Sequence, residues 1–350
     1  MPFNQLTFLS CLLIFFAGDK VSDVTLSETK IAEPAKEVAA NIILQSKDGG
    51  HTWQDISNGL PVVEERMGFF ASESELYLST KDALYSSSSK LKTPLWEKEN
   101  VPNPPSTAIV FNRSGVLAYS NDGHIYQKKP ASPTWVPVYT DLKSTSQKRH
   151  EVAAIFETAD GSVFLSTGKS LSKSTNQAQN WKVSQKSWVG DIVEANGVLV
   201  ATGQQGIMRS VNNGETWEWV ISEGGVGIAV ERIAGGFAAI AYNAQTKSRR
   251  IHLSFDAGKT WKAIDEGLVP SPLISSVKQM GKNLFVGHPD GIFRSSDMGK
   301  TWHRVHAGHG SEFQVIKLVS YNAAVAPVEK VYKLYVSGTV MYAVAVAAGC

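Results

Sequence analysis

An eight-residue pattern, Ser-x-Asp-x-Gly-x-Thr-Trp, recurs along the sequence and limits the folds that are open to it. It occurs in full at residues 46–53, 254–261 and 295–302, and at 210–217 with Asn in place of Asp. Each copy stands between two short apolar runs and holds Asp or Asn close to Gly, the residues that reverse a chain in tight turns. The pattern therefore predicts a β-hairpin in which Trp begins the returning strand.

Tryptophan gives the spacing of these hairpins through the rest of the chain. Trp96, Trp135 and Trp181 fall between the clear copies, so that seven tryptophans lie about forty residues apart, while Trp188 and Trp219 fall outside the series. The turn before Trp181 keeps the spacing but has lost Gly, and the turns before Trp96 and Trp135 keep little more than Trp. A period near forty with short strands is typical of a β-propeller with one four-stranded blade per repeat.

The last full repeat illustrates the expected strands of one blade. Residues 273–277 are predicted as the innermost strand, 283–287 as the second, 291–295 as the third and 302–305 as the outermost. The inner runs are nearly all apolar and the outer runs alternate, as expected when sheets pack face to face around an axis.

The two ends of the chain supply the strands of one further blade. One strand, 41–46, precedes the first Trp, and two strands, 332–337 and 340–345, follow the last one. We therefore predict an all-β, seven-bladed β-propeller over residues 41–350, closed by N- and C-terminal strands in one blade, which leaves no open sheet edge. The segment 313–329 fits either an extra strand or a loop.

Composition and charge narrow the class of protein. Apolar residues make up 43% and charged residues 19% of the chain, which is typical of a globular protein. The formal net charge is +2 and gives no electrostatic reason to expect nucleic acid as a partner. The sequence has two cysteines, Cys11 and Cys350, and Cys11 lies in the N-terminal apolar run, so no internal disulfide is expected.

The N-terminal residues have the pattern of an export signal. The apolar run 6–17 has signal-peptide length and ends in small residues, so residues 1–18 are predicted to be a signal peptide, with a retained membrane anchor as the alternative. Residues 19–40 are polar and are predicted to form a leader or linker, and no later apolar stretch is long enough to span a bilayer. We expect an exported monomer, either periplasmic, on the cell surface or secreted.

The repeated hairpins resemble the Asp-box, or BNR, repeat of sialidase-like β-propellers, over residues 41–350. In size the chain is similar to the photosystem II assembly and stability factor group, whose single seven-bladed propeller is a binding platform without chemistry of its own. In the resembling families the turn lies at the outer rim, on the face opposite the ligand-binding mouth. The resemblance therefore implies a structural role for the fixed residues of the four turns: Asp48, Trp53, Asn212, Trp217, Asp256, Trp261, Asp297 and Trp302.

The same resemblance raises a sialidase-like glycoside hydrolase as the alternative function. Such a site needs an arginine triad, a Tyr–Glu pair and an acid/base Asp, but no Arg-Ile-Pro or Arg-Leu-Pro sequence occurs, and Arg232-Ile233-Ala234 is the nearest match. A pair of carboxylates at suitable spacing is enough for hydrolysis, and four stand on predicted loops of the ligand face: Glu64, Glu65, Asp122 and Asp290. We interpret these as solvated loop carboxylates and predict no catalytic residues. No metal-ligand spacing or phosphate-binding Gly loop occurs, so no metal or cofactor is expected.

The densest basic clusters of the sequence give the hypothesis for the ligand site. Lys148, Arg149 and His150 lie on a predicted loop from a fourth strand to the next first strand, and Arg249 and Arg250 on one from a second to a third strand. Both kinds of loop are expected at one mouth of the channel, where arginine recognises carboxylate or phosphate groups in a planar, bidentate manner. We therefore expect a non-catalytic binding platform for a protein or an acidic glycan. Solvated loop charges are the alternative interpretation of these residues.

Overall fold

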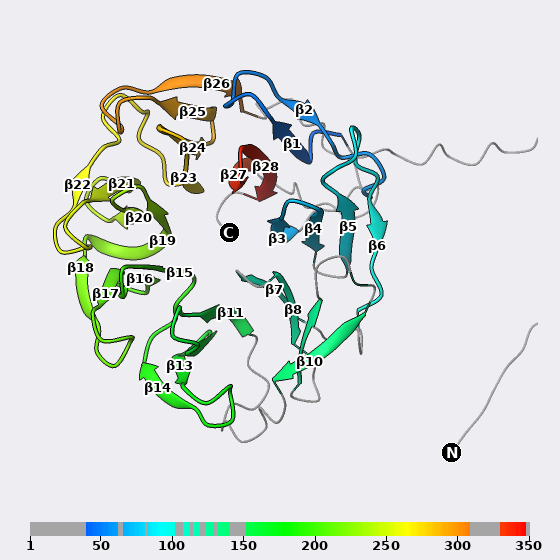
Figure 1. The fold of residues 1–350 in the computed structure, drawn as a ribbon. Coiled ribbons are helices and arrows are strands. Elements are labelled where there is room, and N and C mark those ends of the chain that lie inside the picture. Colours follow the sequence, from blue (N-terminus) through cyan, green and yellow to red (C-terminus); the bar gives the residue numbers. More distant parts are fainter. Residues whose placement is uncertain are drawn as a thin grey trace, which may run out of the picture. The chain divides into compact units, whose positions relative to one another are not determined.

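The described part of the chain folds into a ring of β-sheets (Figure 1). The computed structural model describes residues 40–61, 66–80, 83–101, 108–112, 115–119, 124–128, 132, 134–139, 152–308 and 330–347. All of them belong to the unit Glu37–Cys350, in which seven antiparallel four-stranded sheets stand as blades around a central axis. No helix occurs in these residues, and so none that is long and apolar enough to cross a membrane. The predicted all-β, seven-bladed propeller is confirmed.

Blades 1 to 6 each use four consecutive strands, which we call A to D from the axis outward. The A strands are β3 (Arg66–Ala71), β7 (Ala108–Asn112), β11 (Val152–Glu157), β15 (Ile192–Ala195), β19 (Gly224–Ile233) and β23 (Ser276–Met280). The B strands are β4 (Glu75–Thr80), β8 (Gly115–Tyr119), β12 (Val163–Thr167), β16 (Val198–Gly203), β20 (Gly236–Asn243) and β24 (Asn283–His288).

The outer half of each of these blades completes the sheet. The C strands are β5 (Leu84–Ser88), β9 (Ile125–Lys128), β13 (Leu171–Ser174), β17 (Gly206–Ser210), β21 (Ser248–Ser254) and β25 (Gly291–Ser295). The D strands are β6 (Glu97–Lys98), β10 (Trp135–Tyr139), β14 (Lys182–Gln185), β18 (Glu218–Ile221), β22 (Lys262–Ala263) and β26 (His303–Ala307).

The seventh blade, which we call the closing blade, is made from both ends of the described chain. From the axis outward its strands are β27 (Lys330–Ser337), β28 (Val340–Ala347), β1 (Ile43–Ser46) and β2 (Gln54–Asp55). Strands β28 and β1 pair antiparallel, with Val344 opposite Ile43 and Met341 opposite Ser46. This arrangement confirms the predicted closure of the ring by N- and C-terminal strands in one blade.

The connections between strands gather on two faces of the ring, because neighbouring strands run in opposite directions. We call the face with the A-to-B hairpins and C-to-D turns the turn face, and the face with the B-to-C and D-to-A connections the crossover face. The four copies of the sequence pattern join C to D strands in blades 4, 5 and 6 and in the closing blade. They therefore lie on the turn face.

The same hydrogen bonds hold each full copy of the pattern. In the last copy Ser295 Oγ donates to Asp297 Oδ1 (2.7 Å), and the N–H of Gly299 donates to Ser295 Oγ (2.7 Å). Thr301 donates to Asp297 through its N–H (2.9 Å) and its hydroxyl (2.7 Å). These contacts recur in the copies at residues 46–53 and 254–261. The fixed Ser, Asp and Thr thus satisfy one another and the backbone of the turn.

Acid is expected to weaken these turns. The hydrogen bonds, those from Thr above all, hold the pKa of Asp48, Asp256 and Asp297 well below the ordinary value of a carboxyl group. A carboxylate whose pKa is lowered by folding stabilises the native state above the unfolded-state pKa of about 3.9 and loses this contribution as the pH falls further. We expect the melting temperature to decrease from about pH 4 downward, and to decrease less when all three are changed to Asn. Identical acid profiles for the two proteins would contradict this.

The turns of blade 4, blade 5 and the closing blade also join these blades to the ones before them. In three places a cation that stands directly before the Ser of a turn reaches the turn of the next blade: Lys173 Nζ to Glu215 (2.9 Å), Arg209 Nε to the Ala257 carbonyl (2.6 Å) and Arg294 Nη1 to the Gly49 carbonyl (3.4 Å). A Cβ on Gly214 would lie 2.6 Å from the ring of Phe164 in blade 3, and φ at this glycine is +74°. The turn therefore requires Gly both for its conformation and for its contact with the neighbouring blade.

One predicted strand is wrong in its position. The inner strand of blade 6, predicted at residues 273–277, begins at Ser276 in the structure. Pro270 and Pro272 precede it and lack the backbone donors of a sheet ladder. The carbonyl of Ile274 accepts from Arg249 Nη1 (2.9 Å), a side chain of blade 5. An apolar run that reads as a strand is here a buried part of the connection between two blades.

Several predictions concern residues outside the described ranges. The signal peptide (1–18), most of the leader (19–40) and the segment 313–329 are among them. They stay predictions.

Candidate functional site

The basic residues predicted to bind a ligand fall into two groups. Lys148, Arg149 and His150 lie outside the described residues. Arg249 and Arg250 are the second and third residues of strand β21, and Arg249 is 8% exposed. Besides the side-chain bond to the Ile274 carbonyl, the backbone N–H of Arg249 donates to the Ser271 carbonyl (2.9 Å). These contacts attach the D-to-A connection between blades 5 and 6 to blade 5.

Arg250 belongs to a polar cluster at the crossover face. Its Nε donates to Asp265 Oδ2 (2.6 Å), and this contact raises the pKa of Arg250. His252 Nε2 lies 3.4 Å from Glu223 Oε1, and burial lowers the pKa of His252 although Glu223 opposes the shift. The His252 Nδ1 atom is buried without a partner among the described residues. That Arg249 or Arg250 binds a ligand stays a prediction.

Of the four carboxylates considered for hydrolysis, Asp290 alone lies within the described residues. Its side chain is 51% exposed, and its N–H donates to His288 Nδ1 (3.1 Å). His288 is 1% exposed, and its Nε2 lies 2.9 Å from the Val269 carbonyl. The His therefore fixes the loop that carries Asp290. In the part of the chain that is described, no group of three or more His, Cys, Asp or Glu could hold a metal ion.

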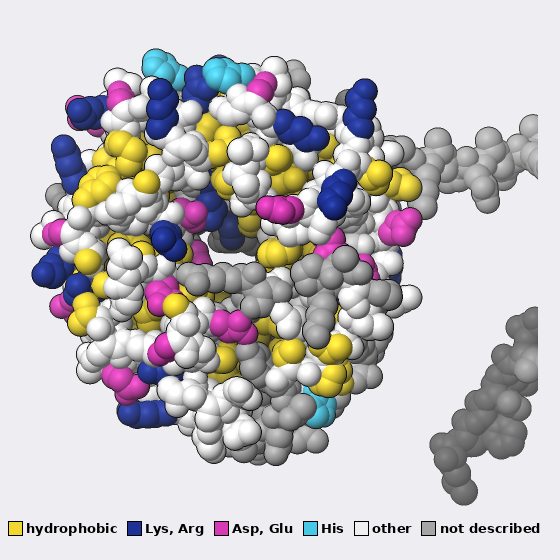
Figure 2. Space-filling model, in the orientation of Figure 1, with side chains coloured by type: hydrophobic (Ala, Val, Ile, Leu, Met, Phe, Trp, Pro, Cys, Tyr) yellow, Lys and Arg dark blue, Asp and Glu magenta, His cyan; other side chains and the backbone are white. Residues whose placement is uncertain are grey.

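Charged side chains line the channel between the A strands, and Figure 2 shows both signs at the central opening. Glu231 of β19 pairs with Lys278 of β23 across the seam between blades 5 and 6. Burial alone would lower the pKa of Lys278, but the Glu231 carboxylate outweighs it and raises the pKa. Burial raises the pKa of half-buried Asp191, against the attraction of Lys278 and Lys333. The charges of the channel thus balance one another within the wall.

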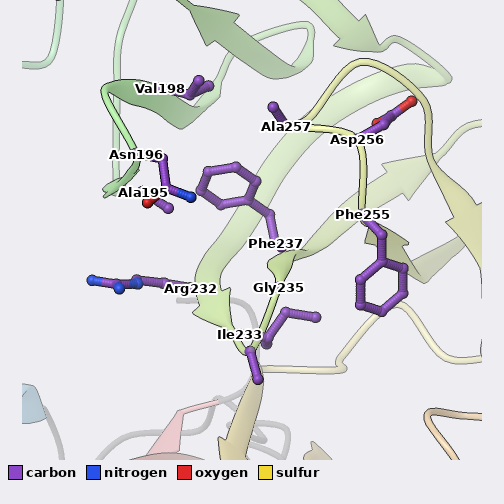
Figure 3. A pocket seen from close by; sticks show the side chains of 12 residues that line it. Ala195, Asn196, Val198, Arg232, Ile233, Gly235, Phe237, Phe255, Asp256 and Ala257 are labelled. Atoms are coloured by element: carbon purple, nitrogen blue, oxygen red, sulfur yellow. The ribbon is translucent and has the colours of Figure 1, made fainter.

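Two adjoining cavities lie on the turn face, over the seams on either side of blade 5. The first, of about 650 Å³, is formed by the hairpins of blades 4 and 5 and by the repeated turn of blade 5 (Figure 3). Its lining includes Ala195, Asn196, Val198, Arg232, Ile233, Gly235, Phe237, Phe255, Asp256 and Ala257. The second, of about 580 Å³, is formed over blades 5 and 6 and shares Ala234 and Phe255 with the first. Both are open to solvent, and we call the two together the turn-face groove.

Phe255 stands between the two cavities and is 58% exposed. It occupies the variable position between Ser and Asp of the repeated pattern, where the copy in blade 4 has Val211, which is 59% exposed. Apolar side chains at a solvent-facing position of a repeated turn can be recognised from the sequence alone. Sequence reasoning assigned the turn to structure and the ligand to the crossover face, and so did not consider this groove.

The sequence matches no family model and no curated protein. Solved structures do match the fold. A GH74 xyloglucanase from Xanthomonas campestris aligns with a TM-score of 0.52 and 14% identity over 71% of this chain and 48% of that one. The extracellular domain of a putative hybrid two component system, BT4673, from B. thetaiotaomicron aligns with a TM-score of 0.53 and 11% identity over 71% and 35%. The chain thus spans half or less of these proteins.

A structure of YCF48 bound to D1 peptide aligns over more of both chains. Its TM-score is 0.54 with 12% identity, over 82% of this chain and 93% of that one. At such low identities these likenesses establish the propeller fold and nothing further about the chain.

Proposed function

We propose that this chain is an exported, non-catalytic binding platform, and that it holds a segment of another protein in the turn-face groove. The observation that carries the proposal is the pair of adjoining cavities with Phe255 between them. Exposed aromatic side chains beside a concave, partly apolar surface are typical of protein-recognition sites. The repeated turns, which we interpret as Asp boxes, present this side chain on a rigid support.

Two of the similar structures support the proposal by their descriptions. One is a propeller bound to a peptide, and this chain covers nearly all of it. Another is the extracellular part of a sensor system, which agrees with the export that we infer from the apolar run 6–17. Sequencing the N-terminus of the protein recovered from outside the cytoplasm tests the export, and a mature N-terminus close to residue 19 is expected.

Peptide selection on the intact chain tests the platform. A random heptamer phage library is panned on the immobilised protein, and the enriched sequences are synthesised and titrated. Replacing Phe255 by Ser is expected to weaken the selected peptides about tenfold or more, because an aromatic anchor is lost. Val269 is 62% exposed on the crossover face, so Val269→Ser is the matched control and is expected to leave the affinity unchanged.

The test also addresses the alternative function. The same protein is incubated with a fluorogenic sialoside and with xyloglucan oligosaccharides. Turnover that depends on Asp290 would favour a glycoside hydrolase and count against the platform. Enriched peptides that bind wild type and Phe255→Ser equally would place the protein contact away from this groove and refute the proposal for it.

A further inference from the structure

Side chains from the A strands close two of the seams between blades on the turn face. Glu194 of blade 4 accepts the N–H of Ala159 in the hairpin of blade 3 (2.8 Å). Gln279 of blade 6 accepts the N–H of Ala234 in the hairpin of blade 5 (2.6 Å). Both residues stand two positions before the A-to-B hairpin of their own blade. Each contact ties a blade to the hairpin of the blade before it.

The seam between blades 4 and 5 has Arg232 at this position. A guanidinium group carries donors only, so Arg232 cannot accept the N–H of Asn196 in the hairpin of blade 4. Among the described residues that N–H has no acceptor, and exposed Arg232 has no ion-pair partner. Val336, at the corresponding position of the closing blade, offers neither an acceptor nor a charge. At the turn face the seam between blades 4 and 5 therefore lacks this hydrogen bond and carries a positive charge, and in this sense we call it the open seam.

The first cavity of the groove lies at this open seam. Figure 3 shows Arg232 and Asn196 on one side of it and Phe255 and Asp256 on the other. Phe237, directly opposite Arg232 in the β19–β20 pairing, is 1% exposed and closes the cavity from within. The Asp256 carboxylate already accepts hydrogen bonds from its own turn. The cavity thus offers unused donors at one end and an exposed aromatic ring at the other.

We propose that this seam binds a carboxylate of the protein ligand. An Asp or Glu side chain of an extended peptide accepts hydrogen bonds from Arg232 and from the Asn196 N–H. A neighbouring apolar residue of the peptide packs on Phe255. The inference rests on the proposed function and adds the chemical class of the ligand. The ligand carboxylate supplies the acceptor that Glu194 and Gln279 supply at the neighbouring seams. Planar, bidentate pairing with a carboxylate is the contact that arginine makes best.

The second cavity favours a peptide over an acidic sugar as the occupant. It continues the groove past Phe255 to Met298 and to Lys282, which is exposed. Cationic and apolar side chains therefore follow one another along the groove. Such a sequence of contacts fits an extended chain, whose side chains are presented one after another along its length.

The variant Arg232→Gln tests the site, because it places at blade 5 the residue that closes the seam between blades 5 and 6. The probes are synthetic peptides chosen by panning the heptamer library on the intact chain, and each is also made with its acidic residue changed to the amide. Enrichment of Asp or Glu beside an aromatic or aliphatic residue is expected. Arg232→Gln should weaken these peptides about tenfold or more, and the amide peptide should lose about as much on wild type but little on the variant.

Arg304→Gln is the matched control, because it removes an exposed guanidinium group from the outer strand β26, outside both cavities, and leaves the open seam intact. Its effect on the acidic peptides should be small and should vanish at high salt, since only a screened, long-range attraction is lost. Both variants should have the melting temperature of wild type. Weaker peptide binding would then not result from a loss of folded protein.

The outcomes separate this inference from the proposed function. Enriched peptides that bind Arg232→Gln as tightly as wild type would overturn the carboxylate site and leave the platform standing. A library without enriched peptides would count against the platform itself. Binding of 3′-sialyllactose that depends on Arg232, without binding of any peptide, would make the ligand a sugar and overturn the peptide assignment.

Discussion

A chain that lacks Val340–Cys350 is expected to lose its cooperative unfolding transition. The deletion removes β28, whose residues Met341, Tyr342, Ala343 and Val344 are each no more than 1% exposed. It also leaves β27 and β1 without the strand that lies between them, so that the ring opens at the closing blade. A typical domain is stable by only about 5–15 kcal/mol in total, so the loss of a fully buried central strand is expected to prevent cooperative folding.

Circular dichroism melts and size-exclusion chromatography measure this effect. Removing residues 348–350 alone is the control, because these lie beyond β28, and it should leave the melting temperature unchanged. A chain without β28 that elutes like the full chain and melts at the same temperature would show that the closing blade is not needed for the ring.

Trp96→Ala is expected to destabilise the fold by about 3–5 kcal/mol, as for other large core aromatics. The Trp96 side chain is 4% exposed, and its Nε1 donates to the Ile56 carbonyl (2.7 Å). It packs with Phe69, at 6.4 Å between ring centroids, in the core cluster shared by blade 1 and the closing blade. The variant therefore loses both packing and a bond that joins the closing blade to its neighbour.

Trp302→Ala is the informative comparison, measured in the same denaturant titration. Trp302 ends a full copy of the pattern and also donates from Nε1 to a carbonyl of the preceding blade, that of Ile264 (2.8 Å). Its ring is only half-buried, so the expected loss is about half of that at Trp96. A larger loss at Trp302 than at Trp96 would show that the turn, rather than burial, decides the contribution of these tryptophans.

Trp96 and Trp302 show why the fold is readable from the sequence. Both donate to the residue that follows the outer strand of the preceding blade, although the turn before Trp96 has lost the pattern. The position of Trp in the blade is thus preserved where the turn is not, and the spacing of Trp predicts the number of blades. The strand predicted at 273–277 begins three residues later, and in the connection before it the Ile274 carbonyl accepts from a side chain of another blade, Arg249, which the sequence does not reveal.

The turn-face groove could not be predicted from the sequence, for a different reason. Arg232 is an isolated charge in a strand, and Asn196-Gly197 is an ordinary hairpin turn. The role that we propose for Arg232 and Asn196 arises because the ring places the inner strand of one blade beside the hairpin of the previous blade. Aligning the three hairpins by their turns would have put Glu194, Arg232 and Gln279 in one column, but only the structure supplies the backbone N–H that each of them faces or fails to bind.

The pairing of β1 with β28 sets the order in which a growing chain can complete this protein. Ile43 is synthesised about three hundred residues before its partner Val344. Blades 1 to 6 consist of consecutive strands and can form as they emerge, whereas β1 keeps an unpaired edge until β28 has been synthesised. A product that stops early therefore carries exposed strand edges, which favour aggregation and degradation. Strand β28 therefore acts as a check on synthesis, since the edge of β1 stays exposed until residues 340–347 have been made.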